Sequence, residues 1–343
     1  TTSAVTPSPN DIAPLLIKEL PMPTHQVTNQ VPLLIDTNPA DAPSINDALH
    51  RAGLDQSTVD EIRALGAFAG TAEAIELGDL AEAHPPVLTT HDRFGHRIDE
   101  VVYDPAYHQL MTHAVHAGLH GAPWSDPRPD AHLIRAAKFS VWGHVDAGHG
   151  CPISMTYAAV PALRAAPDLA AQYEPLLTAR EYQPGLTAPL SKRGLIAGMS
   201  MTEKQGGSDV RTNTTTAVPQ TDGSYLITGH KWFTSAPMSD LFLTLAQAPG
   251  GLTCFLVPRV LPDGSRNTFA LQRLKNKLGN HSNASSEVEY QDTVAWRVGD
   301  EGSGVRTIVE MVNLTRLDCT IGSATAMRTG TAQATHHAIH RSA

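Results

Sequence analysis

The sequence predicts an α+β fold with an N-terminal helical domain, a middle antiparallel β domain and the start of a C-terminal helical domain. Three observations predict it. Apolar residues recur at three- and four-residue steps between about residues 44 and 195, the period shortens to two near residue 198, and the helical period returns after residue 299. We therefore divide the chain into an extended N-terminal segment (1–43), a helical domain (44–197), a β domain (198–298) and the first helix region of a second helical domain (299–343).

Residues 1–43 are rich in Pro, Thr and Asn and have little apolar periodicity, so we expect a flexible extension or one that lies along the surface. The helical domain opens with a capping-box spacing, in which Ser57 and Thr58 precede Asp60 and Glu61. Pro85-Pro86 ends this first helix. Its apolar face recurs at three- and four-residue steps and consists of Ile62, Leu65, Phe68, Ala72 and Ile75.

Three more helices are expected in this domain. Asp104-Pro105 supplies an N-cap followed by proline at the first helical position, and Gly118 ends that helix. Another helix is expected from Asp130 through Trp142, and a further one follows Pro152.

The β domain is predicted from alternating residues around turn sequences. "TNTTTAVPQ" and "SYLITGHKWFTS" flank an Asp-Gly turn, and "LFLTLAQ" and "LTCFLVPRV" flank a Pro-Gly-Gly turn. "SSEVEYQDTVAWRV" supplies at least one more strand. The helical pattern after Val305 has no stop signal before Ala343, so we expect this helix to reach the last residue and the intact protein to continue beyond it.

The composition narrows the class of function. Lys and Arg number 25 against 34 Asp and Glu, a net charge of −9, which gives the chain as a whole no basic surface for nucleic acid. The three cysteines are far apart and form no CxxC pair, as expected in a reducing compartment. No run of eighteen apolar residues and no signal-peptide pattern is present. We therefore expect a cytoplasmic protein that does not enter a membrane.

The stretch "MTEKQGGSD" at 201–209 is the first candidate for ligand binding. Gly206 and Gly207 allow successive backbone N–H groups to face an anion, Ser208 adds a hydroxyl, and Thr202 can bond a polar ligand edge. An ordinary strand-to-turn connection remains the alternative. A P-loop is excluded because no Gly-Lys-Ser/Thr follows, and a Rossmann fingerprint is excluded because no helix opens at this loop.

A second stretch, "GHKWFTSA" at 229–236, follows one hairpin later and can bring Phe233 and Ser235 beside this loop. An aromatic face next to a hydroxyl suits a flat heteroaromatic ring, although a core aromatic is the plain alternative for Phe233 alone.

Together these motifs resemble the acyl-CoA dehydrogenase family, in which "TEPxxGSD" and "GxKxWITN" carry the flavin site. "GHKWF", "KLGNHSNAS" and "MTEKQGGSDV" are most similar to the AidB-like branch, flavoproteins of the bacterial response to DNA alkylation. The resemblance is specific over about 198–341 and looser over 44–197. It implies the acyl-CoA dehydrogenase fold, FAD as cofactor, an acyl-CoA substrate and a homotetramer.

The resemblance also implies roles for individual residues. Residues 199–202 would line the flavin, with Thr202 bonding the isoalloxazine edge, and Gly207 and Ser208 would meet the flavin phosphates or the acyl-CoA. Phe233 replaces a tryptophan behind the ring and Ser235 replaces a threonine near N5. The full cofactor set implied is Met199, Ser200, Met201, Thr202, Gly207, Ser208, Phe233, Thr234, Ser235 and Arg341, the last reaching the FAD of a neighbouring subunit.

Acyl-CoA oxidation removes a proton from Cα and a hydride from Cβ, so it needs a base and a flavin acceptor. Ser208, Asn313 and Arg316 occupy family positions near the substrate. The family base is a glutamate at one of two positions; Thr315 occupies the first, and the second lies beyond residue 343. The sequence therefore contains no identifiable base. A DNA-associated flavoprotein with weak or no dehydrogenase activity is the alternative function, with DNA bound through a basic region outside this chain.

Two histidine groups are candidate metal ligands. His336 and His340 form an i, i+4 pair on one helix, but no acid or cysteine is nearby, which favours a solvated helix face. His144, Asp146, His149 and Cys151 form a better ligand set, but they straddle a helix end and the resembling family uses no metal, so we expect no metal site.

Overall fold

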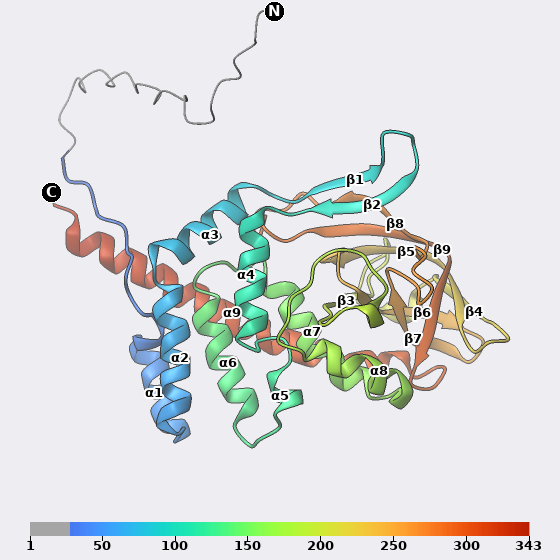
Figure 1. The fold of residues 1–343 in the computed structure, drawn as a ribbon, viewed down its shortest axis with the longest axis horizontal. Coiled ribbons are helices and arrows are strands. Elements are labelled where there is room, and N and C mark those ends of the chain that lie inside the picture. The colour runs from blue at the N-terminus through green and yellow to red at the C-terminus, as the bar shows by residue number, and fades with distance from the viewer. Residues whose placement is uncertain (1–27, 343) are drawn as a thin grey trace, which may run out of the picture.

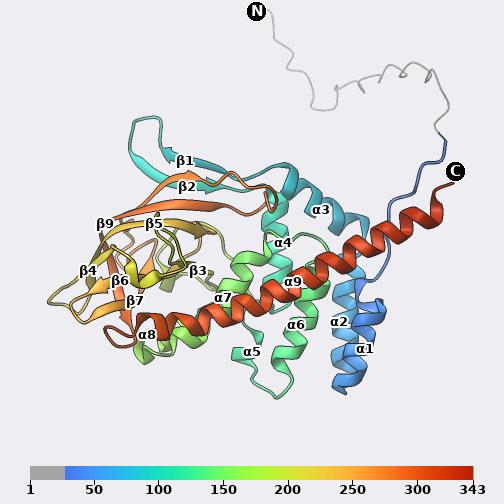
Figure 2. The same ribbon diagram turned by 180° about the vertical axis from the view of Figure 1, so that it is seen from behind.

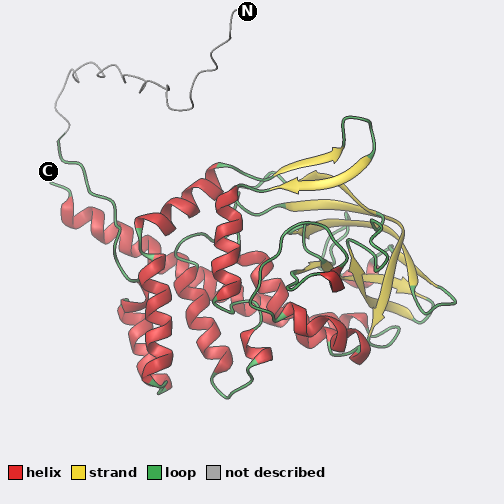
Figure 3. Cartoon of the chain, viewed as in Figure 1, coloured by secondary structure: helices red, strands yellow, loops and turns green. Residues whose placement is uncertain are grey.

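A computed structural model describes residues 28–342 and confirms the α+β fold. Most helices lie in one half of the molecule and the strands lie in the other, where α8 and the start of α9 pack beneath them (Figure 3). The N-terminal helices are α1 (Pro43–Ala52), α2 (Gln56–Ala69), α3 (Ala72–Ala83), α4 (Pro105–His116), α5 (Ala122–Ser125), α6 (Ala131–Trp142), α7 (Gly150–Leu163) and α8 (Pro167–Leu177). Short 3-10 turns lie at Pro39–Asp41, Pro189–Ser191 and Val210–Thr212.

The first predicted helix is in fact two helices. Asp55, two residues before the predicted cap, accepts a hydrogen bond from Thr58 N (2.9 Å) and starts α2. Thr71 then accepts one from Ala74 N (3.2 Å) and starts α3. The break lies at Gly70, where a Cβ atom would be 1.5 Å from Thr37 O. The segment that contains Thr37 therefore divides the predicted helix by its close approach to Gly70. The periodicity of the sequence carries no information about such a contact.

The helices predicted near Asp104, Asp130 and Pro152 are present as α4, α6 and α7. Asp104 accepts from Ala106 N (2.8 Å), and Gly118 adopts a left-handed conformation just after α4 (φ 79°). Helix α7 is buried along almost its entire length and packs against the β domain, where Thr156 Oγ1 accepts from Ala197 N (2.9 Å). It therefore lies at the junction of the two halves.

A hairpin that the sequence analysis did not predict interrupts the helical domain. Strands β1 (Val87–His91) and β2 (Arg97–Val102) pair in antiparallel fashion. Asp92 Oδ1 accepts from both Phe94 N (2.8 Å) and His96 N (2.9 Å) and shapes the turn. The hairpin lies along the edge of the β domain (Figure 1), where Asp99 Oδ1 accepts from Leu271 N (3.1 Å). The prediction of an all-helical segment is wrong here.

The β domain contains a seven-stranded sheet in the order β3-β5-β4-β6-β7-β9-β8, with additional β3–β6 and β5–β9 pairings. Its strands are β3 (Ala197–Ser200), β4 (Thr216–Pro219), β5 (Tyr225–Ser235), β6 (Leu241–Ala248), β7 (Gly251–Pro258), β8 (Phe269–Leu274) and β9 (Ser285–Val298). Both predicted hairpins, β4–β5 and β6–β7, are antiparallel pairs. Strands β3 and β8 were not predicted. The first predicted strand is shorter than "TNTTTAVPQ", because Thr214 and Thr215 bond a buried carboxylate, described below.

Helix α9 (Gly304–His340) is 37 residues long and runs across the face of the molecule that is nearest the viewer in Figure 2, from the β domain past the N-terminal helices. It ends at His340, not at Ala343 as expected, and the helix-capping N–H of Arg341 donates to His337 O. Two buried side chains join it to α6: the Arg135 guanidinium binds both carboxylate oxygens of Asp318, with Nη2 to Oδ2 at 2.7 Å.

Residues 28–41, here called the strap, run along α2 and the C-terminal part of α9 (Figure 1). Arg328 donates to Pro39 O (2.9 Å), His336 Nε2 bonds Pro32 O (2.8 Å) and Arg341 donates to Asn29 O (3.0 Å). The part of the N-terminal segment that is described therefore lies along the surface. Residues 1–27 of that segment lie outside the described residues.

Candidate functional site

The loop at 201–209 follows β3 and is anchored from inside by Glu203. This side chain is fully buried, and its Oε1 accepts from Thr215 Oγ1 (2.6 Å) and Lys231 Nζ (3.0 Å). Its Oε2 accepts from Thr214 N (2.7 Å). Lys231 also donates to Leu245 O (2.7 Å). The acidic residue of the motif is therefore used in this internal network, whereas Thr202 before it is half-buried and Lys204 after it is exposed.

The charges of this network are mutually stabilised. Burial alone would raise the pKa of Glu203, but hydrogen bonds from Thr214 and Thr215 and the nearby Lys231 ammonium outweigh it and hold that pKa well below its usual range. Burial lowers the pKa of Lys231, and the Glu203 carboxylate opposes this effect. The pair is therefore a structural ion pair with its hydrogen-bonding capacity occupied, and not a proton-transfer group.

The two glycines of the loop differ in what they require. Gly206 has φ 117°, a backbone conformation that favours glycine. Gly207 packs against Thr202, where an added Cβ would lie 2.6 Å from Oγ1. Gly207 and Ser208 are exposed, and Thr202 and Met201 are half-buried. The loop thus offers an outward face that begins at Thr202 and continues through Ser208.

The end of β5 lies directly beside this loop, as the motif spacing predicted. Ser200 pairs with Thr234 in the sheet, and Trp232 N donates to Thr202 O (2.7 Å). Side chains alternate along a strand, so Phe233 and Ser235 share one face and Thr234 the other. The Phe233 ring is 50% exposed, and the Ser235 hydroxyl lies 3.0 Å from Ser285 Oγ.

Two of the predicted cofactor residues have buried side chains. The hydroxyls of Ser200 and Thr234 lie 2.6 Å apart in the interior, and Tyr290 donates to Ser200 Oγ at 3.3 Å. Met199 is half-buried and packs against the apolar cluster that includes Leu243. Ser200 and Thr234 therefore hold the two strands in register, and the outward face is formed by their neighbours.

The remaining predicted residues lie on α9 or directly after it, at two well-separated places. Asn313 and Arg316 are exposed, and the half-buried Thr315 donates its hydroxyl to Val312 O (2.9 Å) on its own helix. Arg341 directly follows His340, the last residue of α9, and donates to Asn29 O of the strap. Within this chain, Arg341 is therefore not brought together with the residues of β5.

Family models match two parts of the chain. The model for the adaptive response protein AidB N-terminal domain matches residues 29–184, and the model for the acyl-CoA dehydrogenase middle domain matches residues 198–293. AidB of Escherichia coli K12 is 47% identical over 324 residues, which are 93% of this chain and 59% of that protein. The chain is an AidB-like member of the acyl-CoA dehydrogenase family.

Solved structures agree with this assignment. The Caenorhabditis elegans protein ACDH-11, in complex with C11-CoA, has a TM-score of 0.79 at 30% identity, covering 90% of this chain and 54% of that one. A glutaryl-CoA dehydrogenase from Mycobacterium smegmatis in complex with FADH2 has a TM-score of 0.59 at 16% identity, covering 81% of this chain and 64% of that one, and shows the common fold. The chain thus spans between half and two thirds of the length of these relatives.

The structure adds Cys151 to the site of this AidB-like chain. Burial raises the pKa of its thiol, with the nearby Ser235 and Asn283 side chains opposing this effect, so the neutral thiol is favoured. From the sequence, Cys151 is a candidate only as a metal ligand, in a set with His144, Asp146 and His149. Asp146 and His149 pair with each other (Oδ2 to Nδ1, 2.8 Å), and Asp146 also accepts from Ser282.

Lys275 is a second residue that the motifs did not indicate. Its ammonium lies 3.3 Å from the ring centre of Trp232 and 4.6 Å from that of Phe233, and 2.8 Å from Glu287 Oε1. It therefore places a positive charge beside the exposed aromatic face of the AidB-like site. Only its three-dimensional position, on the segment after β8, could reveal it.

No group of three or more His, Cys, Asp or Glu side chains is arranged to hold a metal ion within residues 28–342. His336 bonds the strap at Pro32 O, and His340 bonds His336 O (2.8 Å). In the same described part of the chain, no helix combines the length and the hydropathy needed to cross a membrane.

Proposed function

We propose that the intact protein binds FAD at the face formed by the 201–209 loop and the end of β5, and that it oxidises an acyl-CoA to the enoyl-CoA. The observation that carries this proposal is the hydrogen bond from Trp232 N to Thr202 O, which brings the two motif segments into contact. The hydroxyl of Thr202 and the aromatic ring of Phe233 then lie on neighbouring segments, as a flat polar-edged ring requires.

The residues present fit such a ring. A Cβ atom at Gly207 would lie 2.6 Å from Thr202 Oγ1, so glycine allows the backbone of the loop to lie against the Thr202 side chain. The Phe233 ring is half exposed, although burying such a ring is favourable, and this is consistent with a ligand that covers it. Lys275 beside this ring would favour a ligand that carries or acquires negative charge.

When bound, FAD supplies the acceptor for the hydride that leaves Cβ of the acyl group. The chain itself would hold the reactants: Thr202 and Ser235 present hydroxyls to the ring edge, and Ser208, Asn313 and Arg316 bind the acyl-CoA. Arg316 carries a permanent positive charge on an exposed face of α9, suited to the phosphates of CoA.

The proton that leaves Cα needs a base other than Thr315. The Thr315 hydroxyl has no basicity at neutral pH and already donates to Val312 O. We propose that a carboxylate from the part of the family's length that this chain does not span accepts the proton. Arg341 would reach the FAD of a neighbouring subunit in a homotetramer, which its position beside the strap, away from β5, allows.

An absorption spectrum of the intact purified protein, before and after anaerobic addition of a short acyl-CoA, tests this proposal. Flavin bands that bleach support both cofactor and reaction. Bands that persist across several acyl-CoAs support the cofactor but contradict the reaction, and DNA binding by the intact protein would then be measured. Complete absence of flavin, including after incubation with FAD, contradicts the whole proposal.

Matched variants locate the flavin on this face. Phe233→Ala should weaken FAD binding about tenfold or more, since ring stacking contributes on the order of 1 kcal/mol beyond buried area. Phe94→Ala is the control, because Phe94 is also an exposed phenylalanine (73%) but lies at the tip of the β1–β2 hairpin. Equal FAD affinity of the two variants would contradict the proposed position of the ring.

A further inference from the structure

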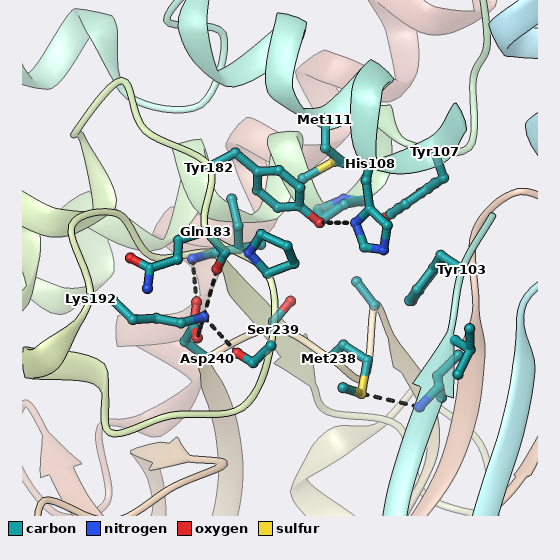
Figure 4. A pocket seen from close by; sticks show the side chains of 17 residues that line it. Tyr103, Tyr107, His108, Met111, Tyr182, Gln183, Lys192, Met238, Ser239 and Asp240 are labelled. Carbon is teal, nitrogen blue, oxygen red and sulfur yellow. Dashed lines mark hydrogen bonds and ion pairs between the residues drawn. The ribbon is translucent and has the colours of Figure 1, made fainter. Parts of the chain in front are cut away.

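A cavity of about 240 Å³ lies between α4, β2, the segment at 182–185 and the connection from β5 to β6 (Figure 4). An apolar cavity of roughly 150 Å³ accommodates benzene, so this one has room for a substituted ring. Pro152 and Ala236 belong to its wall and are the immediate chain neighbours of Cys151 and Ser235. The cavity therefore lies directly behind the proposed flavin face.

Six of the seventeen residues that line the cavity have aromatic or sulfur-containing side chains. Tyr103 and Tyr107 stack on each other with ring centres 4.2 Å apart. The Tyr182 hydroxyl lies 2.9 Å from His108 Nδ1, which fixes both rings. Met111 and Met238 complete the wall on opposite sides (Figure 4). Contacts with flat rings and thioethers add binding free energy for an aromatic ligand beyond the contribution of its buried area.

The cavity has no charge available for a ligand. Lys192 Nζ uses its three protons on Asp240 Oδ1 (2.6 Å), Gln183 O (2.7 Å) and Gly185 O (2.7 Å). Burial lowers the pKa of His108, with the Asp104 charge opposing it, so the imidazole is neutral at neutral pH. An uncharged guest is therefore favoured over an anion or a cation.

One polar group on the wall has no partner. Ser239 is 3% exposed, and its hydroxyl makes no hydrogen bond within the described part of the chain. Figure 4 shows Ser239 on the cavity wall between the Lys192–Asp240 pair and Met238. Buried polar groups almost always have partners. A guest with a hydrogen-bonding atom near this wall would satisfy the hydroxyl.

We propose that this cavity binds a small uncharged aromatic group that carries one hydrogen-bonding substituent, bonded to Ser239 Oγ. The ring packs among Tyr103, Tyr107 and Tyr182. It belongs either to a free phenol-like molecule or to the acyl group of a CoA thioester, and only the second case rests on the proposed function.

Ligand-observed fluorine NMR with para-fluorophenol tests the site on the intact flavin-loaded protein. We expect saturable binding that Ser239→Ala weakens about five- to tenfold, as loss of one hydrogen bond predicts. The same substitution should leave the melting temperature unchanged or higher, because the hydroxyl has no protein partner to lose. Ser154→Ala is the matched control: Ser154 is another buried serine with an unpartnered hydroxyl, but it does not line the cavity.

Competition between fluorophenol and acyl-CoA thioesters shows whether the ring belongs to a free molecule or to an acyl group. Phenylpropionyl-CoA that displaces fluorophenol, where butyryl-CoA does not, assigns the ring to an acyl group. Fluorophenol that binds and resists both thioesters assigns the site to a free molecule, whether or not the protein oxidises acyl-CoA. Absence of saturable fluorophenol binding, or equal loss of binding in the Ser239 and Ser154 variants, overturns the proposal.

Discussion

Glu203 is the residue that shapes the 201–209 loop. Glu203→Gln would leave Lys231 as a buried cation without a carboxylate and would direct an amide N–H₂ toward donors on Thr214 and Thr215. Breaking such a buried pair costs about 3 kcal/mol or more of the free energy of unfolding. Urea denaturation of the variant measures it.

The double variant Glu203→Gln, Lys231→Met serves as control. It removes the orphaned ammonium and should recover part of the lost stability, which a double-mutant cycle quantifies. A loss below about 1 kcal/mol in the single variant would contradict a structural role for the pair.

A buried histidine predicts how stability depends on pH. The pKa of His120 is lowered to about 4, mainly by burial. The hydrogen bond from Nε2 to Ala179 O acts in the opposite direction, and the positive charges of Arg135 and Arg180 act in the same direction as burial. The folded state therefore binds fewer protons than the unfolded state, whose pKa is near 6.5. The contribution of His120 to the free energy of unfolding is fully present above about pH 6.5. It is lost as the pH falls toward 4, and the total loss is about 3 kcal/mol.

Unfolding free energies at several pH values between these limits check this prediction. His120→Asn should reduce the slope of the unfolding free energy against pH. His337→Asn, at an exposed position, should leave this slope unchanged. An unchanged slope in the His120 variant would show that other groups cause the acid sensitivity.

At the scale of single elements, the loop between β3 and β4 places the Gly207 backbone against the Thr202 side chain. Gly207→Ala would force the Thr202 side chain to move, because the new Cβ would lie 2.6 Å from its Oγ1. We expect FAD affinity to fall about tenfold while the melting temperature changes little. Gly279→Ala is the matched control, since nothing lies within 4 Å of a Cβ added there. Similar flavin titrations of the two variants would contradict a role for this contact.

Most elements could be predicted because their signals are local. Asp104-Pro105 and the Asp-Gly turn give α4 and the β4–β5 hairpin through caps and turn geometry. The misses have long-range causes: α2 and α3 separate where Thr37 approaches Gly70, and the predicted first strand shortens where Thr214 and Thr215 bond Glu203. No window of neighbouring residues contains those partners.

The same distinction applies to the site. The motifs predicted that the 201–209 loop and the end of β5 lie together, because both are contiguous sequence features. Cys151 lies beside Ser235 only because α7 packs on the β domain, and Ser239 faces a cavity that distant segments enclose. Motif similarity could not indicate that the Ser200 and Thr234 side chains point inward, although strand alternation relative to Phe233 offered that signal for Thr234.

At the scale of the whole molecule, Arg135 and Asp318 attach α9 to the helical domain. Both side chains are about 2% exposed, and Arg135 also lies over the Tyr157 ring at 4.0 Å. Asp318→Asn would leave the guanidinium buried without its counter-charge, which costs about 3 kcal/mol. We expect faster amide hydrogen exchange along α9 before that of β6 and β7 changes. Uniform acceleration across the molecule would mean that α9 does not separate as a unit.

The strap has a consequence for protein synthesis. Its contacts with Arg328, His336 and Arg341 join residues 289, 304 and 312 positions apart in the sequence. Domains generally fold as units while the chain emerges from the ribosome. The strap is made early, but its partners on α9 are made hundreds of residues later, so it has to wait undocked while the β domain forms. Its attachment to α9 is then among the last events of folding.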